Sequence, residues 1–238
     1  MEINRMDNSR KPMLEGLKEL YQLLDKKSLS QAHFLFLAVY VVALHTGFIP
    51  QNFFVNQLKS LFPLESWSTF HKKNVEICCS QPPTYEYDSP HETYFHERFS
   101  TNVKAEQDDA LKSVLTAIVS GDFMMITLTP HHSTKLLGRS SCLSIGRYVI
   151  SHSEDPRTVE ACYQKLDQLR LQLRNEVFMP VRGDQLSCIG AFPHPSLTGI
   201  PRELRFRIYE YLLAARRVKL LKINKTLRAE INGWLGDE

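Results

Sequence analysis

Residues 91–97, HETYFHE, hold the grouping of side chains in this chain that comes nearest to a metal site. A zinc protease motif needs two histidines four residues apart on a helix, so that both point at one ion. His91 and His96 are five residues apart, which on a helix turns them about 140° from each other. A preceding proline and two aromatic residues favour an extended segment in any case. We therefore expect no zinc site here, and we expect His131 and His132 to be turn residues rather than ligands.

The remaining reactive side chains do not match the motifs that catalysis requires. The stretch GRSSCLS lacks the glycine pair that frames an esterase nucleophile. Gly138 and Gly146 do not form a phosphate-binding loop, and no Gly-Lys-Ser or Gly-Lys-Thr is present. Cys78 and Cys79 would suit redox chemistry, but we favour a place in the core. We predict no catalytic residue, no cofactor and no metal, and hence an interaction protein rather than an enzyme.

The N-terminal part of the chain is predicted to form two helices. Met13–Leu24 is amphipathic, and we expect the first dozen residues before it to be mobile. A second helix is expected over Gln31–Thr46, with Ser30 as its N-cap and Gly47 as its stop signal. Its apolar run Phe34–Leu44 is shorter than the roughly twenty residues that span a membrane, so we expect a helix buried on all sides.

Strand signals occupy the middle of the chain. NVEICC (74–79) is a strand candidate, and Ser80–Ser100 is expected to be a long loop with short strand pieces. Two β-prone runs in Ser113–Pro130 flank Gly121-Asp122, which supplies the positive φ of a tight hairpin. Cys142–Ile150 is predicted to be a further strand.

A long helix is predicted next, from Pro156 to Phe178, with Asp155 as its N-cap and Pro180 as its end. Gly183–Gly199 is interpreted as a linker because it is rich in glycine and proline. The helix carries one apolar stripe: Val159, Cys162, Tyr163, Leu166, Leu169, Leu173 and Val177. Helices, then antiparallel strands, then a helix predict an α+β fold in which an antiparallel sheet packs with helices.

Composition restricts the compartment and the partners. The five cysteines are irregularly spaced without a CxxC, which fits free thiols in a reducing compartment. The first residues contain no apolar signal-peptide segment, so we expect a cytoplasmic protein, with the nucleus left open. Gly199–Glu238 holds nine Lys and Arg against five Asp and Glu. This basic segment either meets an acidic partner or forms a solvated face.

The helix predicted after Gly199 has two apolar faces. Phe206 and Tyr209 lie away from its main stripe. The stripe contains Ile200, Leu204, Ile208, Tyr211 and Leu212. A segment of about 40 residues makes too small a core to bury both faces. The excess apolar surface therefore packs against the preceding domain or is offered to a partner.

This segment resembles an F-box, whose first helix has the pattern Leu-Pro-x-Glu-Leu with aliphatic residues following. The matching residues are Ile200, Pro201, Glu203, Leu204, Ile208 and Leu212. The continuation RRVKLLKINKTLRAEI resembles the second and third helices of that module. The resemblance implies docking on the Skp-type adaptor of an SCF ubiquitin ligase, with Ile200, Pro201, Leu204, Ile208 and Leu212 in an apolar groove of the adaptor.

The upstream region resembles an FP domain, the fold shared by the PI-type proteasome inhibitor and the family of F-box only protein seven and Nutcracker. Leu20-Tyr21-Gln22, the apolar helix and the segment 45–51 stand in the family's order, and the F-box follows directly. The resemblance implies an FP domain at 13–182, after a flexible stretch 1–12. A linker at 183–198 and an F-box at 199–238 would follow. It also implies dimerisation, with itself or with the proteasome inhibitor, and a cullin as a further partner.

The chain departs from the family in three ways. The family's ubiquitin-like domain and proline-rich tail have no counterpart in this sequence, and the second F-box helix is basic. A short paralogue, a fragment and an incomplete gene model remain open. Two other functions are retained: a proteasome-regulator-binding module without ligase work, and basic C-terminal helices that bind RNA or an anionic membrane surface. On the favoured hypothesis neither nucleic acid nor membrane is a partner.

Overall fold

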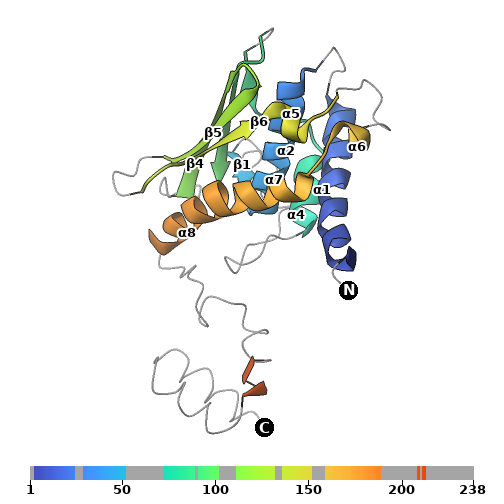
Figure 1. Cartoon of the computed structure of the whole chain (residues 1–238). Coiled ribbons are helices and arrows are strands. Elements are labelled where there is room, and N and C mark those ends of the chain that lie inside the picture. Colours follow the sequence, from blue (N-terminus) through green and yellow to red (C-terminus); the bar gives the residue numbers. More distant parts are fainter. Residues whose placement is uncertain are drawn as a thin grey trace.

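The computed structural model describes residues 3–24, 29–51, 72–88, 91–101, 111–131, 136–151, 159–188, 208–209 and 211–212. These residues form an antiparallel sheet with helices packed against it, which confirms the predicted α+β class. Figure 1 shows the sheet on one side of the molecule and helices α1, α2 and α4 on the other.

The helices differ widely in length. Their bounds are α1 (Ile3–Leu23), α2 (Gln31–His45), α4 (Lys72–Cys79), α5 (Ile145–Tyr148), α6 (Val159–Cys162), α7 (Leu166–Leu173), the π-helical turn η4 (Arg174–Phe178) and α8 (Met179–Cys188). Helix α1 begins ten residues before the expected start at Met13 and carries Pro12 inside it.

All strand pairs in the sheet are antiparallel. The strands are β1 (Ile49–Pro50), β2 (Glu86–Tyr87), β3 (Tyr94–Ser100), β4 (Lys112–Ser120), β5 (Phe123–Pro130) and β6 (Arg139–Ser144). Their order is β1-β3-β4-β5-β6, and β2 also pairs with β3.

Helix α2 lies at the centre of the core, as its composition predicts. The Ser30 side chain accepts a hydrogen bond from the His33 N–H and so caps the helix. Every residue from Ala32 to Leu44 is buried. The Phe36 ring stacks on the Phe95 ring of β3, with 4.6 Å between the ring centroids. Among the described helices, none is both long and apolar enough to cross a membrane.

The hairpin predicted around Gly121 is confirmed. Ser120 pairs with Phe123, and Gly121 has a φ of 55° in the turn between β4 and β5. Burial alternates along both strands, so that one face of the sheet covers α2 and the other does not.

Of the two predictions for the segment before this hairpin, the first is wrong and the second is partly correct. NVEICC forms helix α4 rather than a strand, because Val75, Cys78 and Cys79 have helical spacing and all bury toward the core. Ser80–Ser100, expected to be a long loop with short strand pieces, contains β2 and the seven-residue interior strand β3, whose residues Phe95 and Phe99 pack inward. Between them the buried Glu97 also points inward, and this charged residue interrupts the apolar alternation that would have marked a strand in the sequence.

The strand predicted for Cys142–Ile150 is only partly correct. Strand β6 ends at Ser144, and Ile145 and Tyr148, three residues apart, turn inward from the short helix α5. The Ile145 N–H donates to the Asp122 carbonyl at 2.8 Å, which ties this helix to the hairpin turn.

The single long helix is also corrected, although its apolar stripe is buried as expected. It is interrupted between α6 and α7, where Lys165 has a φ of 52° and Tyr163 forms a β-bridge with Val149. Pro180 does not end it. The π turn η4 shifts the hydrogen-bond register just before the proline, and α8 continues to Cys188, into the predicted linker. The predicted cap at Asp155 lies outside the described residues.

Candidate interaction surfaces

The described part of the predicted F-box helix is one turn, at residues 208–209 and 211–212. The Leu212 N–H donates to the Ile208 carbonyl at 3.1 Å, as in a helix. Ile208 is 37% exposed and Tyr211 is 88% exposed, whereas Tyr209 is buried. Residues 208, 211 and 212 share one helix face by their spacing. Among the predicted adaptor contacts, Ile200, Pro201 and Leu204 lie outside the described residues.

A second surface is the outer face of the sheet, the side that faces away from α2. Four directly paired residues form a row across it: Tyr94 pairs with Ile118, Ile118 with Met125, and Met125 with Cys142. Tyr94, Ile118 and Met125 are between 42% and 52% exposed, and Cys142 is exposed as well. We call these four residues the apolar row. Apolar side chains that line up on a solvated sheet face are typical of a contact surface.

The neighbouring residues of this face are polar and complete a mixed surface. The next row consists of His96, Thr116, Thr127 and Ser140. The Tyr94 and His96 rings stack at 6.3 Å between centroids, and the Thr127 and Ser140 hydroxyls share a 2.9 Å hydrogen bond. Phe123, 54% exposed, extends the apolar area at the hairpin turn. The arrangement of an apolar centre and a polar margin resembles that of protein–protein interfaces.

The apolar row follows from strand register, which the sequence does not state. Tyr94 falls in a segment expected to be a loop, so its place opposite Ile118 was not predicted. One signal was present: Phe123-Met124-Met125-Ile126 are four consecutive apolar residues, and a strand of that kind carries apolar side chains on both faces.

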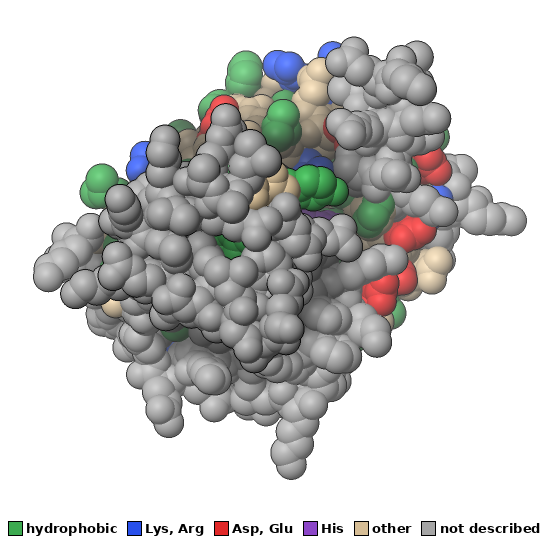
Figure 2. All heavy atoms as spheres, turned by 90° about the horizontal axis from the view of Figure 1, so that it is seen from below, with side chains coloured by type: hydrophobic (Ala, Val, Ile, Leu, Met, Phe, Trp, Pro, Cys, Tyr) green, Lys and Arg blue, Asp and Glu red, His purple; other side chains and the backbone are tan. Residues whose placement is uncertain are grey.

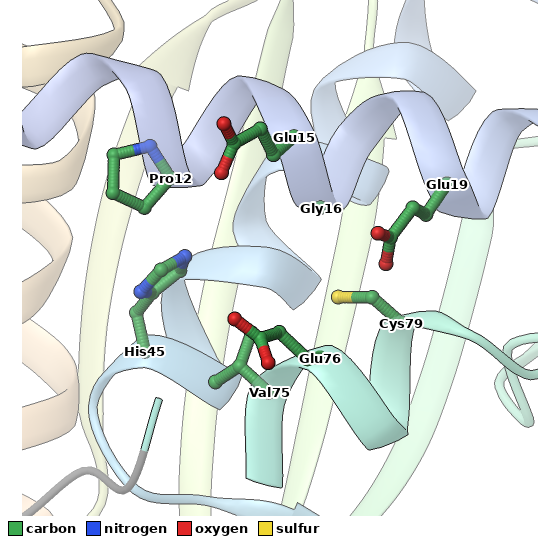
Figure 3. Close-up of a pocket in the computed structure, with 8 residues that line it drawn as sticks. All are labelled: Pro12, Glu15, Gly16, Glu19, His45, Val75, Glu76 and Cys79. Carbon is green, nitrogen blue, oxygen red and sulfur yellow. The ribbon is translucent and has the colours of Figure 1, made fainter. Parts of the chain in front are cut away.

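A small pocket lies between α1 and α4. It has a volume of about 140 Å³. Glu15, Glu19 and Glu76 point into it from these two helices (Figure 3). Seen from below, several acidic side chains lie close together on the molecular surface (Figure 2). Burial, with the charges of Glu76 and Glu15 added, raises the pKa of Glu19.

The two other ionisable side chains of this pocket are poorly suited to catalysis. Burial raises the pKa of the Cys79 thiol far above its ordinary value, so the thiol stays protonated. Burial, and then the charge of Arg170, lowers the pKa of His45 to about 4. The neutral imidazole is therefore a weak base. This pocket offers neither a thiolate nor an imidazolium at neutral pH.

Comparison with known proteins finds a relative that spans most of the chain. The chain is 34% identical over 216 residues to Protein nutcracker of Drosophila melanogaster. The matched region covers 88% of this chain and 68% of that protein. No family model matches the chain.

Proposed function

The chain belongs to the family of Nutcracker and F-box only protein seven, and from this premise we propose that it is a non-enzymatic substrate-receptor subunit of an SCF-type ubiquitin ligase. Its F-box would dock on the Skp-type adaptor in the cytoplasm, and other subunits would transfer ubiquitin. The observation that supports this role most directly is the exposed turn at Ile208 and Tyr211, which lies within the F-box pattern. A helix that presents one apolar face suits a groove on a partner.

Binding to a purified Skp-type adaptor, measured by calorimetry, tests this proposal. Truncating both Leu204 and Ile208 to alanine should abolish measurable binding, since anchors of this kind contribute about 2 kcal/mol or more each. The matched control is Leu137→Ala, a truncation of a leucine that is 70% exposed and outside the F-box. Normal adaptor binding by the double variant, with the thermal unfolding of the chain unchanged, would remove the F-box assignment.

We propose in addition that the outer face of the sheet pairs the FP domain with a second FP domain, either another copy of this chain or that of the proteasome inhibitor. Tyr94, Ile118, Met125 and Phe123 each expose about half of their surface, and Cys142 is exposed as well. Apolar side chains of this size expose roughly 100 Å² in that situation, so these four large side chains together provide about half of the 800 Å² per partner in a standard interface. The polar row beside them would supply the rest.

Two rival functions predict different results when the chain is purified from cells or when its binding is measured at rising salt. A proteasome-regulator-binding module without ligase work would retain FP pairing but would not co-purify a cullin from cells. Basic C-terminal helices that bind RNA or an anionic membrane would lose their affinity steeply as salt rises. Docking through an apolar groove depends much less on salt, because little of its free energy comes from exposed charges.

A further inference from the structure

Glu92 and His33 form a partly buried hydrogen-bonded pair that neither proposed docking surface uses. His33 is fully buried, and its Nδ1 lies 2.9 Å from a Glu92 carboxylate oxygen. The other carboxylate oxygen accepts a 3.0 Å hydrogen bond from the Ser30 N–H at the start of α2. Because an ionised carboxylate only accepts, Nδ1 donates to Glu92, and Nε2 lies 2.7 Å from the Tyr85 hydroxyl oxygen. We call the contacts of Glu92 with His33 and Ser30 the latch.

The latch holds the Glu92 backbone in a conformation that this residue type disfavours. Its φ of 49° lies in the left-handed region, where a side chain with a Cβ is strained. Burial acts to raise the pKa of Glu92, but the hydrogen bonds from His33 and Ser30 outweigh it and hold the pKa below its ordinary value. A strained residue persists only when its surroundings fix it, so the loop conformation depends on these bonds.

The described part of the β2–β3 loop that the latch fixes, residues 91–93, ends at the apolar row. The Glu92 N–H donates to the Asp88 carbonyl at 2.7 Å, and the Tyr94 N–H donates to the Asp88 carboxylate at 2.6 Å. The Val119 N–H, next to Ile118, donates to the Thr93 carbonyl at 2.7 Å. Glu92 is thus connected through a short stretch of backbone to Tyr94, the first member of the row.

We propose that Glu92 is a positioning residue for the outer face of the sheet: by pinning the β2–β3 loop to the start of α2, it fixes Tyr94 for contact with a second FP domain. The contact itself rests on the pairing proposed above. The latch does not depend on that pairing, since the hydrogen bonds of Glu92 are made with α2 and not with the apolar row. Removal of the carboxylate would leave the loop without its anchor on α2 while the core beneath it stays packed.

Hydrogen exchange of the full chain tests the latch directly. In Glu92→Ala, the amide protons of Tyr94 and Val119 should exchange at least about tenfold faster, since charge-assisted hydrogen bonds restrain the loop. Glu92→Gln keeps the shape of the side chain and one carbonyl acceptor. Its exchange rates at Tyr94 and Val119 should therefore lie between those of the wild-type chain and of Glu92→Ala. The matched control is Glu160→Ala, which removes the exposed ion pair with Lys18 elsewhere on the surface and should leave these amides unchanged.

Self-association of the same variants, measured by sedimentation equilibrium, tests the positioning role. Glu92→Ala should weaken association at least about tenfold, with partial rescue in Glu92→Gln and no change in Glu160→Ala. Unchanged exchange at Tyr94 and Val119 would overturn the latch. Faster exchange with unchanged association would overturn the positioning role and leave the pairing intact. If the wild-type chain associates neither with itself nor with the FP domain of the proteasome inhibitor, the pairing proposal fails, and with it the positioning role, while the exchange rates still decide whether the latch exists.

Discussion

The guanidinium of Arg182 lies directly against Gly47, where a Cβ on the glycine would be 3.0 Å from both Nε and Cζ of the arginine. Arg182 is buried, and burial lowers its pKa to about 10. Gly47 follows the C-cap of α2, where free carbonyls carry partial negative charge that favours a cation. Two segments far apart in the sequence are thereby joined at the end of the central helix.

Gly47→Ala should lower the free energy of unfolding by about 2–4 kcal/mol. The φ of 94° at this residue is strained for alanine, and the new Cβ would displace Arg182. Gly121→Ala is the matched control, because Gly121 also has a positive φ but its added methyl group would meet no neighbouring atom within 4 Å. It should cost only the backbone strain, about 1 kcal/mol. Urea unfolding of both variants makes the comparison, and equal losses would mean that Arg182 moves aside freely.

Gln185→Ala should destabilise the chain by about 1–3 kcal/mol. The buried side-chain amide donates to the Lys112 carbonyl and to the Ser113 hydroxyl, both at 2.9 Å, and so attaches α8 to β4. Ser187→Ala, two residues along the same helix, removes only an exposed hydrogen bond and should change stability by less than about 0.5 kcal/mol. Denaturant midpoints of the two variants would coincide if residues 183–188 were an undocked linker.

Glu97 should make stability fall as pH rises toward neutrality. Its carboxyl is buried on β3, and burial raises its pKa from 4.5 to about 7. A raised folded-state pKa gives stability that is complete below about pH 4.5 and is lost as pH rises through about 7. The loss should approach about 3 kcal/mol.

Thermal unfolding of Glu97→Gln between about pH 4.5 and 8 checks this assignment. The variant should lack the decline seen in the wild-type chain over that window, whereas Glu160→Gln, at an exposed site, should retain it. A decline that persists in Glu97→Gln would have to come from another group.

Replacing Ile118 with aspartate should abolish FP pairing and leave the fold intact. A carboxylate at the centre of the apolar row cannot be buried against an apolar partner without a large desolvation cost. Thr129→Asp is the control, since this exposed residue is on the same face of β5 outside the row. Sedimentation equilibrium should give a monomer for the first variant and wild-type behaviour for the second.

The thiols provide an independent measure of the same contact. Cys142 and Cys188 are exposed, whereas Cys78, Cys79 and Cys162 are buried. Alkylation followed by mass spectrometry should modify Cys142 and Cys188 first. As the protein concentration rises, the rate at Cys142 should fall and the rate at Cys188 should not. Parallel rates at all concentrations would place the contact elsewhere.

Local signals predicted those elements whose causes lie within a few residues. Gly121 marked the hairpin, and Ser30 with the apolar run after it marked α2, because turns and caps are set by adjacent side chains. The place of Tyr94 in the sheet and the break at Lys165 were missed, since both depend on pairing with strands and turns far along the chain. For the same reason, the sequence predicted the F-box surface but not the apolar row. The F-box pattern is contiguous, while the apolar row exists only after four strands have come into register.

The burial of α2 from Ala32 to Leu44 also affects the folding of the chain during its synthesis. The Tyr163 hydroxyl donates to the Phe34 carbonyl across 129 residues of sequence, and the strand that stacks on Phe36 also follows it along the chain. At about 5–20 residues per second, ribosomes need roughly 10 s to supply these partners. During that interval only the preceding helix α1, whose Tyr21 ring contacts Phe34, is present to cover α2, and most of its apolar surface stays exposed to chaperones. The rate of synthesis beyond Leu44, rather than the stability of the finished fold, would then set how much of this protein escapes aggregation.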